Sequence, residues 1–189
     1  MLNSRVQYII YLLTLIFCSI AFQGFADGDN ETAYIPLIKF NQAAQSQKWV
    51  LNSWSGEKKA TLSFEHDADS EYPDFARLNY TKSDATFNNF AFFQENKAKW
   101  QNKPVKGFYL RYRIKDLDGS SQYEYVCDKY SFYNGMGLVR DGKWNILKMN
   151  PGGWCKTSQQ FSFDAVNFVN LIFHGSGTVD IAELGIIFE

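Results

Sequence analysis

The chain has 189 residues, with 19 Lys and Arg, 20 Asp and Glu, and a formal net charge of −1. This balance lacks the positive charge that non-specific nucleic-acid binding requires, because such binding releases counterions from phosphates, and we expect no nucleic-acid partner. Its 17 Phe, 11 Tyr and 5 Trp are too many for a disordered chain, and aromatic residues favour strands. The composition therefore predicts a folded, β-rich protein.

The first 26 residues have the pattern of a secretory signal peptide. Arg5 is the only charged residue before an apolar segment over 6–20. Gly24 and Ala26 then place small residues at positions −3 and −1 of a cleavage site. A membrane anchor is the alternative, but a spanning helix needs ~20 apolar residues. We therefore expect a secreted or periplasmic protein with no membrane span after cleavage.

Cleavage would leave an N-terminal extension over 27–37 and one domain over 38–189. The length of this second segment is typical of a single domain. Short strand-like runs are expected at 34–40, 60–65, 76–80, 87–93, 108–114, 123–127, 144–149, 161–163, 168–173 and 179–188. Gly- and Asp-containing turns separate many of these runs, and single short helices are expected at 41–47 and 94–103. This order predicts an all-β jelly-roll, a β-sandwich of two antiparallel sheets.

One of these runs alternates clearly. Phe108, Leu110 and Tyr112 should face the core, which leaves Tyr109, Arg111 and Arg113 outward. The next run offers Tyr123 and Tyr125 on one face, or Gln122 and Glu124 on the other.

Two cysteines lie outside the predicted signal peptide, Cys127 and Cys155. In an exported chain two thiols most simply form a disulfide bond, and the alternative is a pair of buried thiols.

The order of the strand motifs resembles that of the galactose-binding-like carbohydrate-binding modules. The motifs, which span about 38–189, are the strand at 75–80, the central strand at 107–113 with its Asp/Gly turn, the Trp-containing strand at 142–147 and the terminal strand at 179–184. The resemblance implies a non-catalytic domain that binds a polysaccharide or oligosaccharide on a solvated sheet face. It also implies a structural calcium ion near the termini, for which Asp180 and Glu183 are the candidate ligands; no other cofactor is expected.

Sugar sites combine exposed aromatic rings with planar hydrogen-bonding groups. The predicted binding residues are Tyr109, Arg111, Arg113, Tyr125, Trp54 and Trp154. The alternatives are that Arg111, Arg113 and Glu124 form cross-strand charge pairs, and that the two tryptophans cover the end of the core.

Two other functions stay open. A jelly-roll polysaccharide lyase would use Tyr or His to take a proton and Arg to neutralise a uronate, with His174, Tyr125 and Arg111 as candidates. A surface or periplasmic protein-interaction domain is the third class, and the sequence leaves the sugar and the oligomeric state open.

Overall fold

The structure is a computed structural model, and it describes residues 33–40, 49–53, 60–156 and 158–188. Contacts divide the chain into Met1–Glu31 and Thr32–Glu189, and all of the described residues belong to the second unit. The predicted signal peptide and the helix predicted at 41–47 lie outside the described residues. Within the described part of the chain, no helix has both the length and the apolar character needed to cross a bilayer.

The described strands form one nine-stranded antiparallel sheet. In chain order they are β1 (Ala33–Lys39), β2 (Val50–Ser53), β3 (Ala60–His66), β4 (Asp74–Asn88), β5 (Val105–Asp118), β6 (Ser121–Cys127), β7 (Tyr130–Gly135), β8 (Trp144–Met149) and β9 (Val166–Phe188). The main path of the sheet is β2-β4-β9-β5-β8; β1 and β6 also pair with β9, β3 pairs with β4, and β7 pairs with β6. β1 spans the predicted boundary between the N-terminal extension (27–37) and the domain (38–189).

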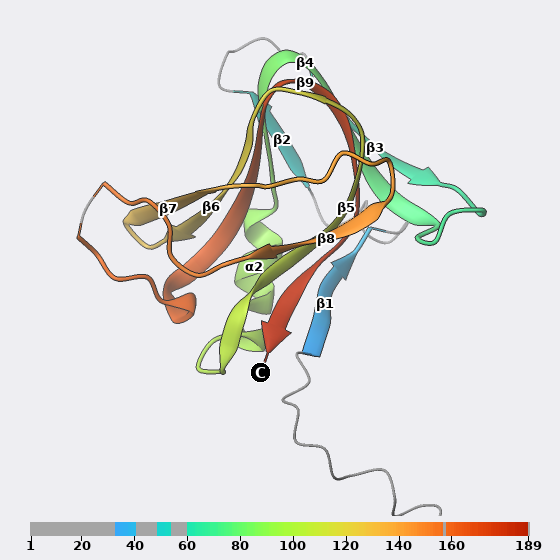
Figure 1. Ribbon diagram of the computed structural model, residues 1–189. Helices are drawn as coiled ribbons and strands as arrows, with labels where there is room; N and C mark the ends of the chain where they lie inside the picture. The colour runs from blue at the N-terminus through green and yellow to red at the C-terminus, as the bar shows by residue number, and fades with distance from the viewer. Residues whose placement is uncertain (1–32, 41–48, 54–59, 157, 189) are drawn as a thin grey trace, which may run out of the picture. The chain divides into compact units, whose positions relative to one another are not determined.

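The long central strand β9 belongs to both halves of the sheet. Its residues before Gly175 pair with β6 and with the end of β4, and those after it pair with β5, with the start of β4 and with β1. We call the first group, completed by β2 and β7, the β6 half, and the second, completed by β3 and β8, the β5 half. Figure 1 shows β4 and β9 curving over together where the halves meet.

This arrangement corrects the prediction of two separate sheets. The sequence predicted two short strands at 168–173 and 179–188, but β9 continues through the residues between them. The fold is therefore sandwich-like, with its two halves joined by the backbone of β4 and β9.

The bend depends on close backbone approach. Gly119 and Gly175 both have positive φ, and a Cβ on Gly175 would overlap the carbonyl oxygen of Asp118. β4 bends at the same level, where its register with β9 shifts between Tyr80 and Ser83. Lys82, with φ of 43°, lies inside that irregularity. Glycine is required here because any side chain would push the paired strands apart.

The inward faces of the two halves form one aromatic core. Phe108, Leu110 and Tyr112 of β5 are buried, as the alternation predicted. The helix α2 (Phe90–Asn96) and the 3₁₀ turn η2 (Lys97–Lys99) add Phe93 and Trp100 to this core. Trp100 is completely buried, and its ring centroid lies 5.6 Å from that of Phe108.

Several predicted elements differ from the structure. The strand predicted at 87–93 ends at Asn88, because the Asn89 side chain accepts a hydrogen bond of 3.0 Å from the backbone N–H of Phe92 and begins α2. The run at 161–163 is no strand, and the turn η3 (Phe163–Ala165) follows it. The strands β2 and β7 were not predicted.

The predicted disulfide bond is absent: Cys127 and Cys155 are not joined. Both side chains pack against the hydrophobic core instead. Burial raises the pKa of the Cys127 thiol to about 12, so this thiol stays protonated at neutral pH. The alternative of buried thiols holds for Cys127, whereas Cys155 is only partly buried.

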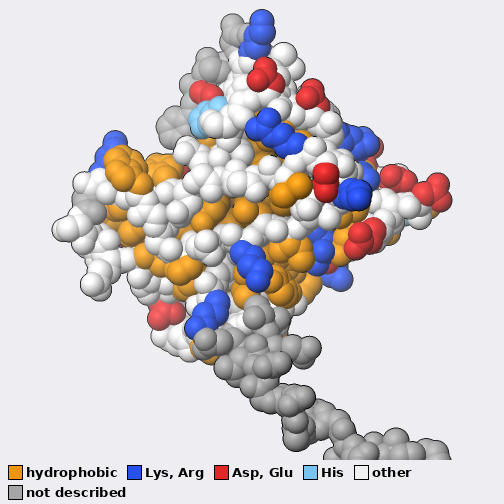
Figure 2. Space-filling model, in the orientation of Figure 1, with side chains coloured by type: hydrophobic (Ala, Val, Ile, Leu, Met, Phe, Trp, Pro, Cys, Tyr) orange, Lys and Arg blue, Asp and Glu red, His pale blue; other side chains and the backbone are white. Residues whose placement is uncertain are grey.

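Charged side chains of both signs are interspersed over the face of the molecule that Figure 2 shows, with apolar side chains between them. Positive charge does not gather there into one broad patch.

The bend gives a stability prediction. Gly175→Ala should lower the free energy of unfolding by about 3 kcal/mol or more, because the substitution adds backbone overlap to an unfavourable positive φ. Gly142→Ala is the matched control: its φ is also positive, but no atom lies near the added Cβ, and it should cost about 1 kcal/mol. Urea unfolding of both variants measures the difference, and equal costs would contradict the argument.

Candidate functional site

The residues predicted as an outward sugar-binding strand lie on the outer face of the β5 half, where Asp180 organises them. The Asp180 side chain is completely buried, and its carboxylate accepts hydrogen bonds from two arginines. Arg77 donates through Nε and Nη2 over 2.7 and 3.0 Å, and Arg113 donates through the same two nitrogens over 3.0 and 2.8 Å. Arg113 is thus held in place from within the protein.

Glu183 plays the same role for the rest of this face. Its carboxylate accepts from Arg111 Nε over 3.1 Å and from the Tyr109 hydroxyl over 3.4 Å, and Lys39 Nζ lies 3.7 Å away. Tyr109 was predicted to face solvent, yet it is only 1% exposed, since the Tyr34 ring of β1 packs edge-on against it. Burial, together with the Glu183 charge, raises the pKa of Tyr109.

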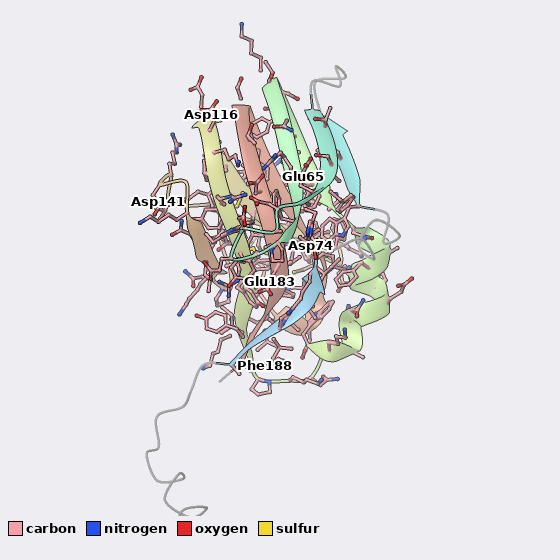
Figure 3. The ribbon with its side chains drawn as sticks, turned by 90° about the vertical axis from the view of Figure 1, so that its right-hand side faces the viewer. Glu65, Asp74, Asp116, Asp141, Glu183 and Phe188 are labelled. Atoms are coloured by element: carbon pink, nitrogen blue, oxygen red, sulfur yellow. The ribbon has the colours of Figure 1, made fainter. Side chains whose placement is uncertain are left out.

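The planar groups of this face contact one another. The Arg111 guanidinium lies 4.6 Å from the Tyr72 ring centroid, and that of Arg113 lies 4.6 Å from the Trp144 ring centroid. The Trp144 indole N–H also donates to Ser70 Oγ over 2.9 Å. In Figure 3 the segment between β3 and β4, which carries Ser70 and Tyr72, crosses in front of the strands near Glu183. These contacts make Arg111 and Arg113 structural, as the charge-pair alternative expected, but with Glu183 and Asp180 as partners rather than Glu124.

Asp180 and Glu183 were also the candidate calcium ligands. Both already have arginine partners, and the described residues contain no group of three or more metal-ligating side chains. Calcium binding stays a prediction, and its test is whether chelation lowers the melting temperature.

A hollow of about 310 Å³ lies beside this cluster, lined among others by Lys39, Glu71 and Glu183. Among the described lining residues, Tyr72 is the only aromatic one, and Arg111 covers one face of its ring. The described part of this lining therefore offers no free aromatic platform for a sugar ring.

Tyr125 corrects the prediction for β6. It is completely buried, and its hydroxyl donates to the Met149 carbonyl over 2.7 Å. Burial holds the pKa of Tyr125 well above its ordinary value. The strand therefore turns its aromatic residues inward, and Gln122 and Glu124 face outward.

That outward face of the β6 half contains the candidate site, an open hollow of about 210 Å³. Its lining residues come from β4, β6, β7 and β9: Asp84, Gln122, Glu124, Tyr133, Ile172 and His174. Antiparallel register places the partners Gln122 and Ile172, and likewise Asp84 and His174, directly opposite each other. The sheet itself thus fixes the positions of these side chains.

A row of hydrogen-bonded polar side chains crosses four strands at the hollow. Asn88 Nδ2 donates to Asn170 Oδ1 over 2.7 Å, and Asn170 Nδ2 donates to Glu124 Oε2 over 2.7 Å. The Tyr133 hydroxyl also hydrogen-bonds Glu124; burial and this contact raise the pKa of Tyr133. Glu124 and Asn170 are buried, so the row is rigid and oriented before any ligand arrives.

Trp154 extends this row. It forms an isolated β-bridge with Tyr133, whose N–H and C=O both pair with the Trp154 backbone at 2.9 Å. Trp154 is 61% exposed, the most exposed of the large hydrophobic side chains in the described part of the chain, and its ring centroid lies 6.2 Å from that of Tyr133. With this exposure, Trp154 does not cover the end of the core, and its role as a platform for a sugar stays a prediction. Trp54, the other candidate platform, lies outside the described residues.

His174 lies at the edge of the hollow. Its Nδ1 is 2.7 Å from Asp84 Oδ1, and both side chains are partly exposed. The three residues of the lyase alternative do not meet: His174 faces outward from the β6 half, Tyr125 faces the core, and Arg111 lies on the β5 half.

No family model and no curated protein matches the chain. Similar solved structures include a family 11 carbohydrate-binding module of a Clostridium thermocellum cellulase, with 10% identity, a TM-score of 0.48, and 86% of this chain and 97% of that chain covered. A xylan-binding domain from Paenibacillus barcinonensis has 9% identity, a TM-score of 0.44, and coverage of 85% and 96%.

A carbohydrate esterase from the bacteriophage phi24B has 10% identity, a TM-score of 0.48, and coverage of 83% and 100%. The neighbours are thus carbohydrate-binding modules, as the order of strand motifs predicted, together with an enzyme. Similarity of this degree transfers no ligand and no residue role to this chain.

Sequence reasoning missed most of the row at the hollow. Asn88, Asn170 and Tyr133 were not predicted, and Glu124 appeared only as an alternative. A signal was available in the run 169–174, where Asn170, Ile172 and His174 alternate with apolar residues that are buried. That alternation would have placed them outward.

The buried cluster gives a second stability prediction. Asp180→Asn should lower the free energy of unfolding by about 3 kcal/mol, because it leaves two guanidiniums facing an uncharged amide. The control is Asp74→Asn, which removes the exposed pair with His66 and should cost less than ~1 kcal/mol. Denaturant unfolding measures both. A cost for Asp180→Asn no larger than the control's would mean that the cluster is not structural.

Proposed function

We propose that this domain binds a polysaccharide, without cleaving it, through the hollow of the β6 half. The observation that carries the proposal is the fixed row from Asn88 to Tyr133, which ends at the exposed ring of Trp154. Sugars present hydroxyl groups around a ring and flat C–H faces above it. Amides and carboxylates can form hydrogen bonds with the hydroxyl groups, and an exposed indole ring can stack on a C–H face.

The row is suited to hydroxyl recognition because each member keeps unused capacity. A carboxylate has about four lone-pair positions, and two of those of Glu124 are used by Asn170 and Tyr133. A sugar hydroxyl can donate to the remainder and accept from an amide N–H of the row. Because neighbouring side chains already hold these groups, little ordering entropy is lost on binding.

Binding is favoured over the alternatives on specific grounds. The proton-abstracting Tyr of a lyase needs an accessible hydroxyl, and that of Tyr125 is buried and bonded to Met149. A protein-interaction domain would be indicated by a contiguous exposed apolar patch. Among the described residues, the other exposed large apolar side chains are scattered over different elements: Ile35 lies on β1, Val139 in the segment between β7 and β8, and Ile146 on β8.

The proposed setting is outside the cytoplasm, either periplasmic or secreted. This part of the proposal rests on the signal-peptide pattern of residues 1–26. A polysaccharide ligand is consistent with that setting.

The proposal predicts a loss of binding without a loss of stability. Trp154→Ala should weaken binding about fivefold, equivalent to ~1 kcal/mol, because it removes the stacking ring. The free energy of unfolding should change by less than ~0.5 kcal/mol, since the ring is exposed. A glycan array first identifies a bound polysaccharide, and affinity electrophoresis then compares the variant with the parent.

The control is Ile146→Ala, an exposed apolar residue opposite Arg111 on the β5 half, which should bind as the parent does. If Arg111→Ala weakened binding in a folded protein while Trp154→Ala had no effect, the binding face would be that of the β5 half. Failure of the exported protein to bind any glycan on the array would reject the proposed function.

A further inference from the structure

The hollow of the β6 half is acidic. Of the six described residues that line it, Asp84 and Glu124 carry carboxylates and none is Lys or Arg. Glu124 lies at the middle of the polar row and is only 6% exposed, so water screens its charge less than it would at the surface. Any group that enters the hollow meets this carboxylate.

The arginines of the described chain are committed elsewhere. Arg77 and Arg113 bind Asp180, and Arg111 binds Glu183, all on the β5 half. Arg140 donates to the carbonyl oxygens of Leu117 and Gly119 near the bend. Among the described residues that line the hollow, none is therefore an arginine that could bind a sugar carboxylate or sulfate in a bidentate way.

We propose that Glu124, assisted by Asp84, is the specificity-determining residue of the hollow, and that it selects uncharged polysaccharides against uronate-containing or sulfated ones. The inference rests on the proposed function, because it concerns which polysaccharide the same site accepts. An uncharged sugar uses the Glu124 carboxylate as a hydroxyl acceptor. An anionic sugar in the same position brings a second negative charge next to Glu124, and the described lining supplies no Lys or Arg to offset it, which is a penalty against the wrong ligand.

The experiment uses pairs of polymers that share a backbone and differ mainly in charge. The protein, obtained by exporting the full chain, is tested by affinity electrophoresis and titration calorimetry against matched pairs: methyl-esterified and de-esterified homogalacturonan, and hydroxyethyl- and carboxymethyl-cellulose. A third pair consists of any neutral polysaccharide found on the glycan array and its carboxymethylated form. The affinities of the two members are then compared for each pair of which at least one member binds. We expect the uncharged member to bind at least ~10-fold more tightly, equivalent to ~1.4 kcal/mol.

Charge-removing variants test the residue assignment. Glu124→Gln keeps the size of the side chain and an oxygen that can accept from Asn170 Nδ2. It should reduce the ratio of affinities for the uncharged and the charged polymer, mainly because the charged polymer binds more tightly. Asp84→Asn should reduce this ratio of affinities less, because the Asp84 side chain is partly exposed. Raising the salt concentration should strengthen binding of the charged member alone, a measurement on the parent protein that does not depend on a variant folding.

The outcomes separate the two proposals. Tighter binding of the charged member, or a preference unchanged both by salt and by the two variants, would overturn the role of Glu124 and leave polysaccharide binding standing. If the protein binds neither member of any pair and nothing on the array, the proposed function fails and the selectivity fails with it.

Discussion

The pairing of β9 with four other strands, β1, β4, β5 and β6, is the constraint on which this structure depends. A single strand of 23 residues contributes to both halves of the sheet, so its bend decides which side chains face the core and which face outward. The bend exists because Gly119 and Gly175 let two backbones approach more closely than any side chain would allow. The core, the arginine cluster and the hollow all take their positions from this strand.

β9 gives the two outer faces opposite characters. On the β5 half it supplies Asp180 and Glu183, which hold arginines against aromatic rings. On the β6 half it supplies Asn170, Ile172 and His174, beside a hollow with a hydrogen-bonded polar row. The planar groups of the first face are occupied by contacts with one another, whereas the second face combines oriented polar groups with the exposed ring of Trp154. This division is the reason for assigning binding to the β6 half.

The polar row at the hollow also explains why binding, rather than catalysis, fits the site. Its groups are held by one another, and Glu124 accepts hydrogen bonds on a buried strand. Such a row presents donors and acceptors in fixed directions, which favours recognition of a hydroxyl pattern. The groups expected for proton abstraction lie on different faces, because β6 turns its tyrosines into the core.

The sequence by itself determined the β-rich class, most strand positions, the buried side of β5 and the order of motifs that resembles carbohydrate-binding modules. These are local properties: alternation and turn residues act within a few positions along the chain. Only the tertiary structure decided which outward residues are free. Tyr109, Arg111 and Arg113 are outward by alternation, but β1, the segment before β4, and the acids of β9 cover or pair them. Asn88, Glu124, Asn170 and Tyr133 meet only through strand register, which joins positions far apart in sequence and cannot be calculated from either strand alone.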